Sequence, residues 1–178
     1  MAMVHVRKAK YRDSPAIARI QVDSYRTAYV AYFPESYLEH FTYEEETQDW
    51  QQLLTSGTDD LLFVAENEMG EIAGYALGRR NTDETKPFDG TLVAMHVRQE
   101  EQQKGFGRAL FAAVAKALQA QGCTSLWLST LPGNPAHAWY ERLGGEQFDE
   151  TEYHVDGSEI VEICYGWDTI QRLQQMLK

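Results

Sequence analysis

The sequence predicts one mixed α/β domain, in which helices flank a mostly antiparallel central sheet. Three observations predict this fold class. Strand-like runs alternate with helical stretches throughout the 178 residues. Short turns join some strands and make those neighbours antiparallel, whereas a strand–helix–strand unit in the second half requires a parallel pair with a crossover. No repeat or low-complexity linker interrupts the chain, so residues 1–178 are expected to form a single domain.

In the first third of the chain, one strand precedes two helical segments. Residues 4–9 are strand-like. Asp13 is a capping residue two positions before Pro15, and this pair is typical of a helix start. Thr42 and Glu45 have the spacing of a capping box, which begins the second helical segment.

The rest of the chain supplies most of the predicted sheet and three more helices. The strands are apolar runs between turn signals, at residues 61–66, 72–79, 91–97, 124–130, 146–154 and 159–167. Gly70 suits a hairpin turn between the first two of these strands, and Asp156 with Gly157 suits one between the last two. The further helices are expected at residues 105–122, 136–143 and from 168 to the end. The apolar stripe of the last helix is expected to pack in the core or in a homodimer interface.

The charge balance limits the classes of partner that the chain is expected to bind. The chain has 16 Lys and Arg against 27 Asp and Glu, a net charge of −11, which disfavours the phosphates of nucleic acids and membranes and favours cationic small molecules or basic peptides. Two cysteines form no disulfide framework, and neither a run of ~20 apolar residues nor an apolar N-terminal signal region is present. We therefore expect a cytoplasmic protein that binds neither nucleic acid nor a membrane.

The segment between the predicted strand 91–97 and the following helix has the features of an anion site. Gly105 and Gly107 lack Cβ atoms, so phosphate oxygens can approach the backbone, and the first N–H groups of the helix have no internal partners. Lys104 and Arg108 add positive charge at the two ends of the loop. The Gly-x4-Gly-Lys-Ser/Thr pattern of a nucleotide-binding P-loop is absent. On spacing alone, diphosphate binding and an ordinary strand-to-helix turn remain equal alternatives.

Two motifs resemble those of the GNAT superfamily of N-acetyltransferases. The run from Gln102 to Gly107 is similar to the Arg/Gln-x-x-Gly-x-Gly/Ala element of that family. About 30 residues on, the run from Asn134 to Gly145 resembles its Asn-x-x-Ala…Tyr-Glu-x-x-Gly-Phe element. Two motifs at the family's separation are more specific than either alone, and the resemblance implies the GNAT-like acyl-CoA N-acyltransferase fold.

The resemblance also implies a binding site for acetyl-CoA. Backbone groups of Met95 and Val97 would pair with the pantetheine arm as an added strand does, and N–H groups of the glycine loop would hold the diphosphate. The implied acetyl-CoA residues are Met95, His96, Val97, Gln102, Gln103, Lys104, Gly105, Phe106, Gly107, Arg108 and Asn134. Asn134 fits equally well as a cap of the following helix. No metal is expected, because the five histidines are scattered without ligand spacing.

Tyr140 is the first catalytic candidate, because it matches the tyrosine that protonates the departing CoA thiolate in this family. A core aromatic residue is the alternative interpretation. The base is left open, because Ser129 stands where many relatives carry a carboxylate. His96 is a candidate because histidine titrates near neutrality, and an ordered water or a residue of the N-terminal half would serve as well. A histidine packed in its strand is the other interpretation of His96.

The implied function is transfer of acetyl from acetyl-CoA to a primary amine by direct attack in a ternary complex. The acceptor is expected to be a polyamine-like or other small cationic amine, with a protein N-terminus or lysine as the alternative. Residues 14–41, residues 42–56 and the turn at Asp156 are expected to recognise it. A non-catalytic CoA-binding module and a phosphate-binding regulatory domain are hypotheses from other classes.

Overall fold

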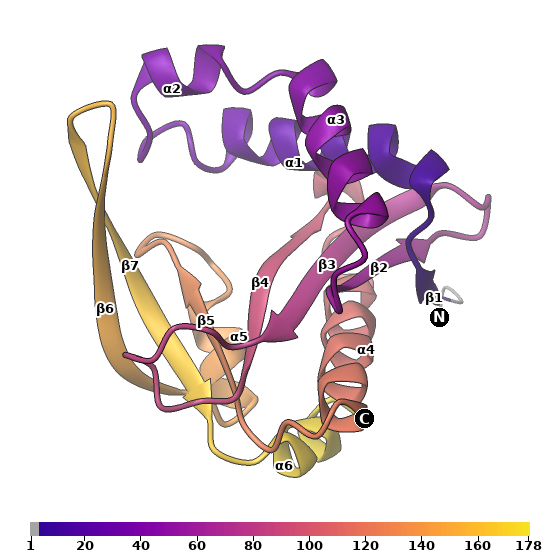
Figure 1. The fold of residues 1–178 in the computed structure, drawn as a ribbon, viewed down its shortest axis with the longest axis vertical. Helices are drawn as coiled ribbons and strands as arrows, with labels where there is room; N and C mark the ends of the chain where they lie inside the picture. Colours follow the sequence, from indigo (N-terminus) through magenta and orange to yellow (C-terminus); the bar gives the residue numbers. More distant parts are fainter. Residues whose placement is uncertain (1–3) are drawn as a thin grey trace.

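Seven strands form one twisted sheet in the computed structural model, which describes residues 4–178 (Figure 1). Their order across the sheet is β1-β2-β3-β4-β5-β7-β6, and every neighbouring pair is antiparallel except β4 and β5. The strands are β1 (His5–Lys8), β2 (Leu61–Glu66), β3 (Ile72–Arg80), β4 (Gly90–Val97), β5 (Leu126–Thr130), β6 (Glu146–Val155) and β7 (Ser158–Trp167). The predicted mixed sheet, mostly antiparallel with one parallel crossover, is confirmed.

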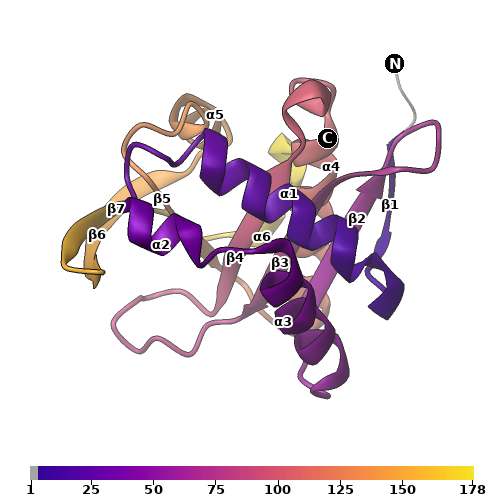
Figure 2. The same ribbon diagram turned by 90° about the horizontal axis from the view of Figure 1, so that it is seen from above.

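Helices cover both faces of this sheet. They are α1 (Ser14–Thr27), α2 (Glu35–Glu39), α3 (Tyr43–Thr55), α4 (Phe106–Ala120), α5 (His137–Arg142) and α6 (Ile170–Met176). Figure 2 shows α1 lying across the sheet and α2 reaching over the β6–β7 hairpin. In α2, Ser36 donates a hydrogen bond of 2.8 Å to Asp156 in the turn of that hairpin. The sequence did not predict α2, because five residues are too short to show a helical period.

Local signals place most element boundaries where they were expected. Thr42 accepts a 3.2 Å hydrogen bond from the N–H of Glu45, and α3 begins at the next residue after this cap. Asp156 and Gly157 both have positive φ, 46° and 81°, as a tight turn of a two-residue hairpin requires. Asp13 is the N-cap residue of α1, as expected, but its side chain accepts no hydrogen bond from the helix. A 3₁₀ turn, Tyr11–Asp13, precedes α1 and turns the Asp13 carboxylate back toward Arg7 and the N–H of Lys10.

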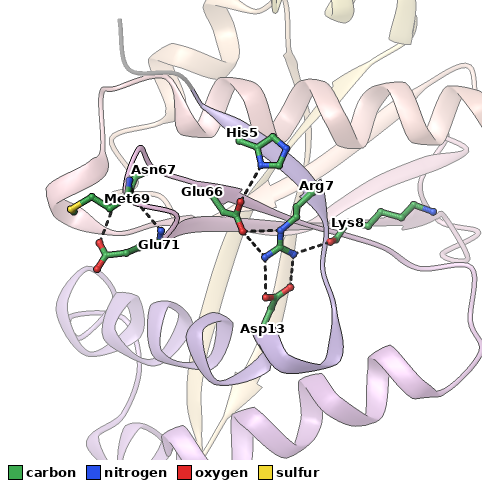
Figure 3. A network of polar contacts seen from close by, with 8 residues as sticks. All are labelled: His5, Arg7, Lys8, Asp13, Glu66, Asn67, Met69 and Glu71. Carbon is green, nitrogen blue, oxygen red and sulfur yellow. Dashed lines mark hydrogen bonds and ion pairs between the residues drawn. The ribbon is translucent and has the colours of Figure 1, made fainter.

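A polar network joins the first strand to its neighbours (Figure 3). The Arg7 guanidinium lies between two carboxylates, 2.7 Å from Asp13 and 2.6 Å from Glu66, so it ties β1 to β2 and to the start of α1. In the β2–β3 turn the Asn67 side chain accepts 3.0 Å hydrogen bonds from the N–H groups of Met69 and Glu71. These contacts fix the N-terminal edge of the sheet.

The apolar side chains form two main layers, one on each face of the sheet. Ile17 of α1, Trp50 of α3 and Tyr75 of β3 are buried on one face. On the other face α4 packs with α6, and the apolar stripe of α6 lies in the core. Of the two expected places for this last helix, the core and a homodimer interface, the structure therefore shows the core. Among the described residues no helix is long and apolar enough to cross a membrane.

The parallel pair β4 and β5 diverges after a single paired position. Thr91 pairs with Trp127, and within the described chain no other residue of β4 pairs with a residue of β5. On its other side β4 stays paired with β3 as far as Val97, opposite Gly74. Figure 1 shows the two strands separating from each other toward α1, and we call the region between their diverging ends the gap between β4 and β5.

Candidate active site

The edge of β4 that faces the gap carries backbone groups suited to bind an extended chain. The N–H of Arg98 donates a 2.8 Å hydrogen bond to Ala73 on β3. Because backbone groups alternate in direction along a strand, those of His96 also face β3, and those of Met95 and Val97 point into the gap. The Val97 carbonyl accepts a 3.2 Å hydrogen bond from the Gln102 side chain, which brings the following loop against the end of the strand.

The loop between β4 and α4 presents a cradle of backbone N–H groups. Gln103 and Gly105 have positive φ, 61° and 93°, and this turns the chain into the first turn of α4. Within the described chain, the N–H groups of residues 103–108 donate no hydrogen bond. A Cβ atom placed on Gly105 or on Gly107 would meet no atom within 4 Å, so open space lies above the loop. The residues present therefore fit a diphosphate through backbone donors and the dipole of α4.

The two basic side chains of the loop are engaged elsewhere. Lys104 pairs with Glu101 at 3.0 Å. Arg108 donates hydrogen bonds of 2.8 and 3.1 Å to the carbonyls of Met176 and Leu177, and so it caps the end of α6. The Arg108 guanidinium keeps its positive charge there but is held by two neutral carbonyls at the end of α6, so its part in anion binding stays a prediction. Asn67 donates a 3.1 Å hydrogen bond to Glu101 and braces the loop from the β2–β3 turn.

A small cavity of about 90 Å³ lies in the gap between β4 and β5. Its walls are Tyr25, Tyr29, Phe33, Leu92, Val93, Ala94, Met95, His96, Leu128, Ser129, Thr130, Leu131, Asn134, Tyr140 and Glu162. A larger cavity of about 960 Å³ runs between α1 and the residues that follow β4, and Val97, Gln99 and Gln102 line it. The predicted residues Met95, His96, Asn134 and Tyr140 are thus brought together at the small cavity, with the glycine loop beyond Val97.

Tyr140 lies on α5 with only 6% of its surface exposed, and its ring packs against Trp139, Tyr165 and Trp167. Its hydroxyl makes no hydrogen bond with any described residue, although it borders the cavity. Burial raises the pKa of this phenol well above its ordinary value of 10. Tyr140 therefore holds its proton at neutral pH, with its ring at the wall of the cavity.

His96 is surrounded by tyrosine rings. Its ring centroid is 5.5 Å from that of Tyr75, 5.8 Å from Tyr29 and 6.1 Å from Tyr25. Burial lowers the pKa of this imidazole to about 4, so the ring is neutral at pH 7. Its side chain makes no hydrogen bond with a described residue, and His96 is one of the residues that line the small cavity.

Asn134 orders the segment that leads into α5. Its side chain donates a 2.7 Å hydrogen bond to Thr130 at the end of β5 and accepts one of 2.9 Å from the N–H of Ala136. The bond to Ala136 closes a turn ahead of α5, whose N-cap is Ala136 itself, so Asn134 is not the cap that the sequence predicted. The same side chain also borders the small cavity, which keeps the second predicted role open to it.

The cavity contains one carboxylate that sequence reasoning missed. Glu162 lies on β7, and its two oxygens accept hydrogen bonds from the hydroxyls of Ser129 and Tyr153. Ser129 pairs with Cys164, two residues along β7, so Glu162 and Ser129 share one face of the sheet. The sequence lacks a carboxylate at position 129, and the neighbouring strand supplies one. Predicting Glu162 would have required the register between β5 and β7, which local sequence patterns do not determine.

Comparisons with known proteins agree with this architecture. A sequence model described as "Acetyltransferase (GNAT) family" matches residues 22–145. The chain is 33% identical over 175 residues to the Bacillus subtilis protein named uncharacterized N-acetyltransferase YuaI, and the match covers 98% of this chain and 99% of that protein. A GCN5-related N-acetyltransferase from Rhodopseudomonas palustris superposes with a TM-score of 0.73 at 16% identity, covering 93% of this chain and 96% of the other. The PaiA N-acetyltransferase of Thermoplasma acidophilum, solved in complex with coenzyme A, gives 0.68 at 18% identity, covering 90% and 98%.

Proposed function

Because the chain belongs to the GNAT family of acetyltransferases, we propose that it transfers the acetyl group of acetyl-CoA to a small cationic primary amine in a ternary complex. The observation that carries this proposal is the gap between β4 and β5. An open strand edge borders one side of it, a cradle of N–H groups follows the end of that strand, and a protonated phenol lies in its wall.

In this proposal acetyl-CoA lies along β4. The amide groups of its pantetheine arm pair with the backbone of Met95 and Val97, as an added strand would. The diphosphate binds the N–H groups from Gln103 to Arg108, where the dipole of α4 favours negative charge. The thioester then reaches the small cavity beside Tyr140, and Asn134 borders its path.

The chemistry requires one new bond, one broken bond and three proton movements, because an amine that enters as an ammonium group must first release a proton to solvent before its nitrogen can attack. The amine nitrogen attacks the thioester carbon, and backbone N–H groups near Val97 stabilise the oxyanion that develops. When the C–S bond breaks, Tyr140 gives its proton to the sulfur. His96, neutral at pH 7, is our candidate to accept the proton that the nitrogen loses, and its pKa of about 4 makes it a weak base. Most of the rate enhancement comes from orientation of the two substrates.

The decisive experiment measures CoA thiol release from acetyl-CoA with a panel of alkylamines, polyamines, amino acids and basic peptides. Release should depend on an amine. Tyr140→Phe should lower kcat by about 10²- to 10⁴-fold because the leaving thiolate loses its acid, while the acetyl-CoA affinity changes by less than about twofold.

Tyr165→Phe is the matched control, because this buried phenol lies beside Tyr140 and bonds to Glu141 rather than lining the cavity. It should keep the wild-type kcat. Acetyl-CoA binding without release in the presence of any amine would indicate a CoA-binding module instead of an enzyme. Wild-type kcat for Tyr140→Phe, where chemistry limits turnover, would return Tyr140 to a purely structural role.

A further inference from the structure

The small cavity holds a carboxylate that the chemistry proposed above does not use. Glu162 is half-buried on β7, where the Ser129 hydroxyl donates to one of its oxygens and the Tyr153 hydroxyl donates to the other at 3.0 Å. Two donors from two different strands fix the plane of the carboxylate. Such a support is typical of a group that must keep one orientation toward a ligand.

No cationic side chain of the described residues neutralises the charge of this carboxylate. Glu162 forms no ion pair with a described residue, and no Lys or Arg lines the cavity. It is also the single carboxylate among the lining residues of the described chain. A half-buried negative charge without a partner is costly, so a cationic group that enters the cavity would be bound strongly.

Aromatic rings form the wall next to Glu162. Tyr25 lies edge-on to Tyr29 with ring centroids 5.1 Å apart, and it contacts Phe33 at 5.3 Å. Burial first, and then the charge of Glu162, raise the pKa of Tyr29, so its phenol stays neutral beside the carboxylate. Aromatic faces around a carboxylate provide the surroundings that bind ammonium groups through cation–π attraction.

We propose, building on the acetyl transfer proposed above, that Glu162 binds the ammonium group of the acceptor and thereby selects amines that enter the pocket positively charged. Ser129 and Tyr153 are positioning residues, which hold the carboxylate, and Tyr25, Tyr29 and Phe33 form the wall against which the cation lies. The volume of about 90 Å³ admits the amine end of an acceptor and a short stretch of its chain.

A binding experiment tests this assignment without any need for turnover. Saturation-transfer NMR is recorded for tetramethylammonium chloride and for tert-butanol, a neutral molecule of similar size, on the wild-type protein saturated with acetyl-CoA. Tetramethylammonium should bind, and Glu162→Gln should weaken it by at least about tenfold while tert-butanol is unaffected. Ser129→Ala, which keeps the charge but removes one support, should weaken it by a smaller factor.

Glu159→Gln is the matched control, because it removes the same charge from an exposed position of the same strand. It should leave tetramethylammonium binding within about twofold of the wild type. Equal binding by the wild type and Glu162→Gln, no binding by the wild type, or an equal loss in Glu159→Gln would each overturn the proposal. Melting temperatures of the variants check that each one is folded.

A kinetic comparison separates this inference from the proposed function. The two acceptors are n-butylamine, charged at pH 7.5, and O-propylhydroxylamine, which has the same number of heavy atoms and is neutral at that pH. Glu162→Gln should raise KM for n-butylamine at least about tenfold and change KM for O-propylhydroxylamine and acetyl-CoA by less than about twofold. Equal effects on the two amines would overturn the role of Glu162 and leave acetyl transfer standing. Absence of acetyl transfer with intact tetramethylammonium binding would overturn the proposed function alone.

Discussion

Glu46 on α3 is a single residue whose ionisation acts against the fold at neutral pH. Burial first, and then the charges of Asp49 and Glu45, raise the pKa of its carboxyl to about 7, against an ordinary value of 4.5. The folded protein therefore binds this proton more tightly than the unfolded chain does. The resulting stabilisation is complete below pH 4.5 and is lost as the pH rises through about 7.

We expect Glu46→Gln to raise the free energy of unfolding at pH 8 and to change it little at pH 4. This side chain is only partly buried, so the gain at pH 8 is about 1 kcal/mol rather than the full value of the shift. Urea unfolding at the two pH values measures it. Glu44→Gln removes a charge from an exposed position of the same helix and serves as the control. An equal effect of Glu46→Gln at both pH values would contradict the assignment.

At the same scale, the sequence identified some residues of the site and not others. Tyr140 and Asn134 stand at fixed positions in a motif, and the structure brings both to the cavity. The engagement of Arg108 with the end of α6 could not be foreseen, because it joins residues 68 and 69 positions apart. Glu162 was missed for the same reason, since it meets Ser129 across a strand pair whose register depends on the whole sheet.

At the scale of the elements, the two glycines of the loop before α4 have different roles, which two substitutions can distinguish. Gly105 has a φ of 93°, which strains any other residue, whereas Gly107 lies in the first turn of α4 with an ordinary φ. Gly105→Val should therefore lower the stability by about 1–2 kcal/mol and weaken acetyl-CoA binding. Gly107→Val should weaken acetyl-CoA binding at least about tenfold with little loss of stability, because its side chain projects into the space reserved for the diphosphate.

Calorimetric titration with acetyl-CoA and thermal unfolding of both variants measure these two effects. A folded Gly107→Val protein with wild-type affinity would show that the diphosphate binds elsewhere. The backbone angles make Gly105, and not Gly107, the position at which a β-branched residue is strained.

The elements themselves were predicted where a local physical signal exists. A capping threonine marks the start of α3, and paired positive-φ residues mark the β6–β7 turn. The five-residue helix α2 has no such signal and was missed. The divergence of β4 from β5 has none either, because strand pairing between residues 91 and 127 depends on contacts that are distant in the sequence.

In the whole molecule, the net charge of −11 is unevenly distributed around the site. Residues 143–171, which include the β6–β7 hairpin and Glu162, contain eight Asp and Glu and no Lys or Arg. The composition gives the size of the charge, but only the fold places this acidic stretch beside the small cavity. The cationic acceptor that we propose would therefore be drawn toward this side of the molecule.

We expect kcat/KM for n-butylamine to fall severalfold between 50 and 500 mM NaCl, because the Debye length shortens from about 14 Å to about 4 Å over that range. The value for O-propylhydroxylamine, measured at the same pH, should change by less than about twofold. Initial rates at a fixed saturating acetyl-CoA concentration give both numbers. A parallel decline for the two amines would show that salt acts on the enzyme and not on the approach of the cation.

The single paired position between β4 and β5 leaves the sheet unfinished at its centre. In the proposed complex the pantetheine arm supplies the hydrogen bonds that a neighbouring strand would otherwise make, so the co-substrate becomes part of the secondary structure. Because acetyl-CoA binds the folded protein, it adds to the free energy of unfolding, by about 2.7 kcal/mol when acetyl-CoA is present at 100 times its Kd. The two halves of the sheet are consequently least firmly joined in the free protein, and amide hydrogen exchange at Met95 and Val97 slows as the missing strand is filled in.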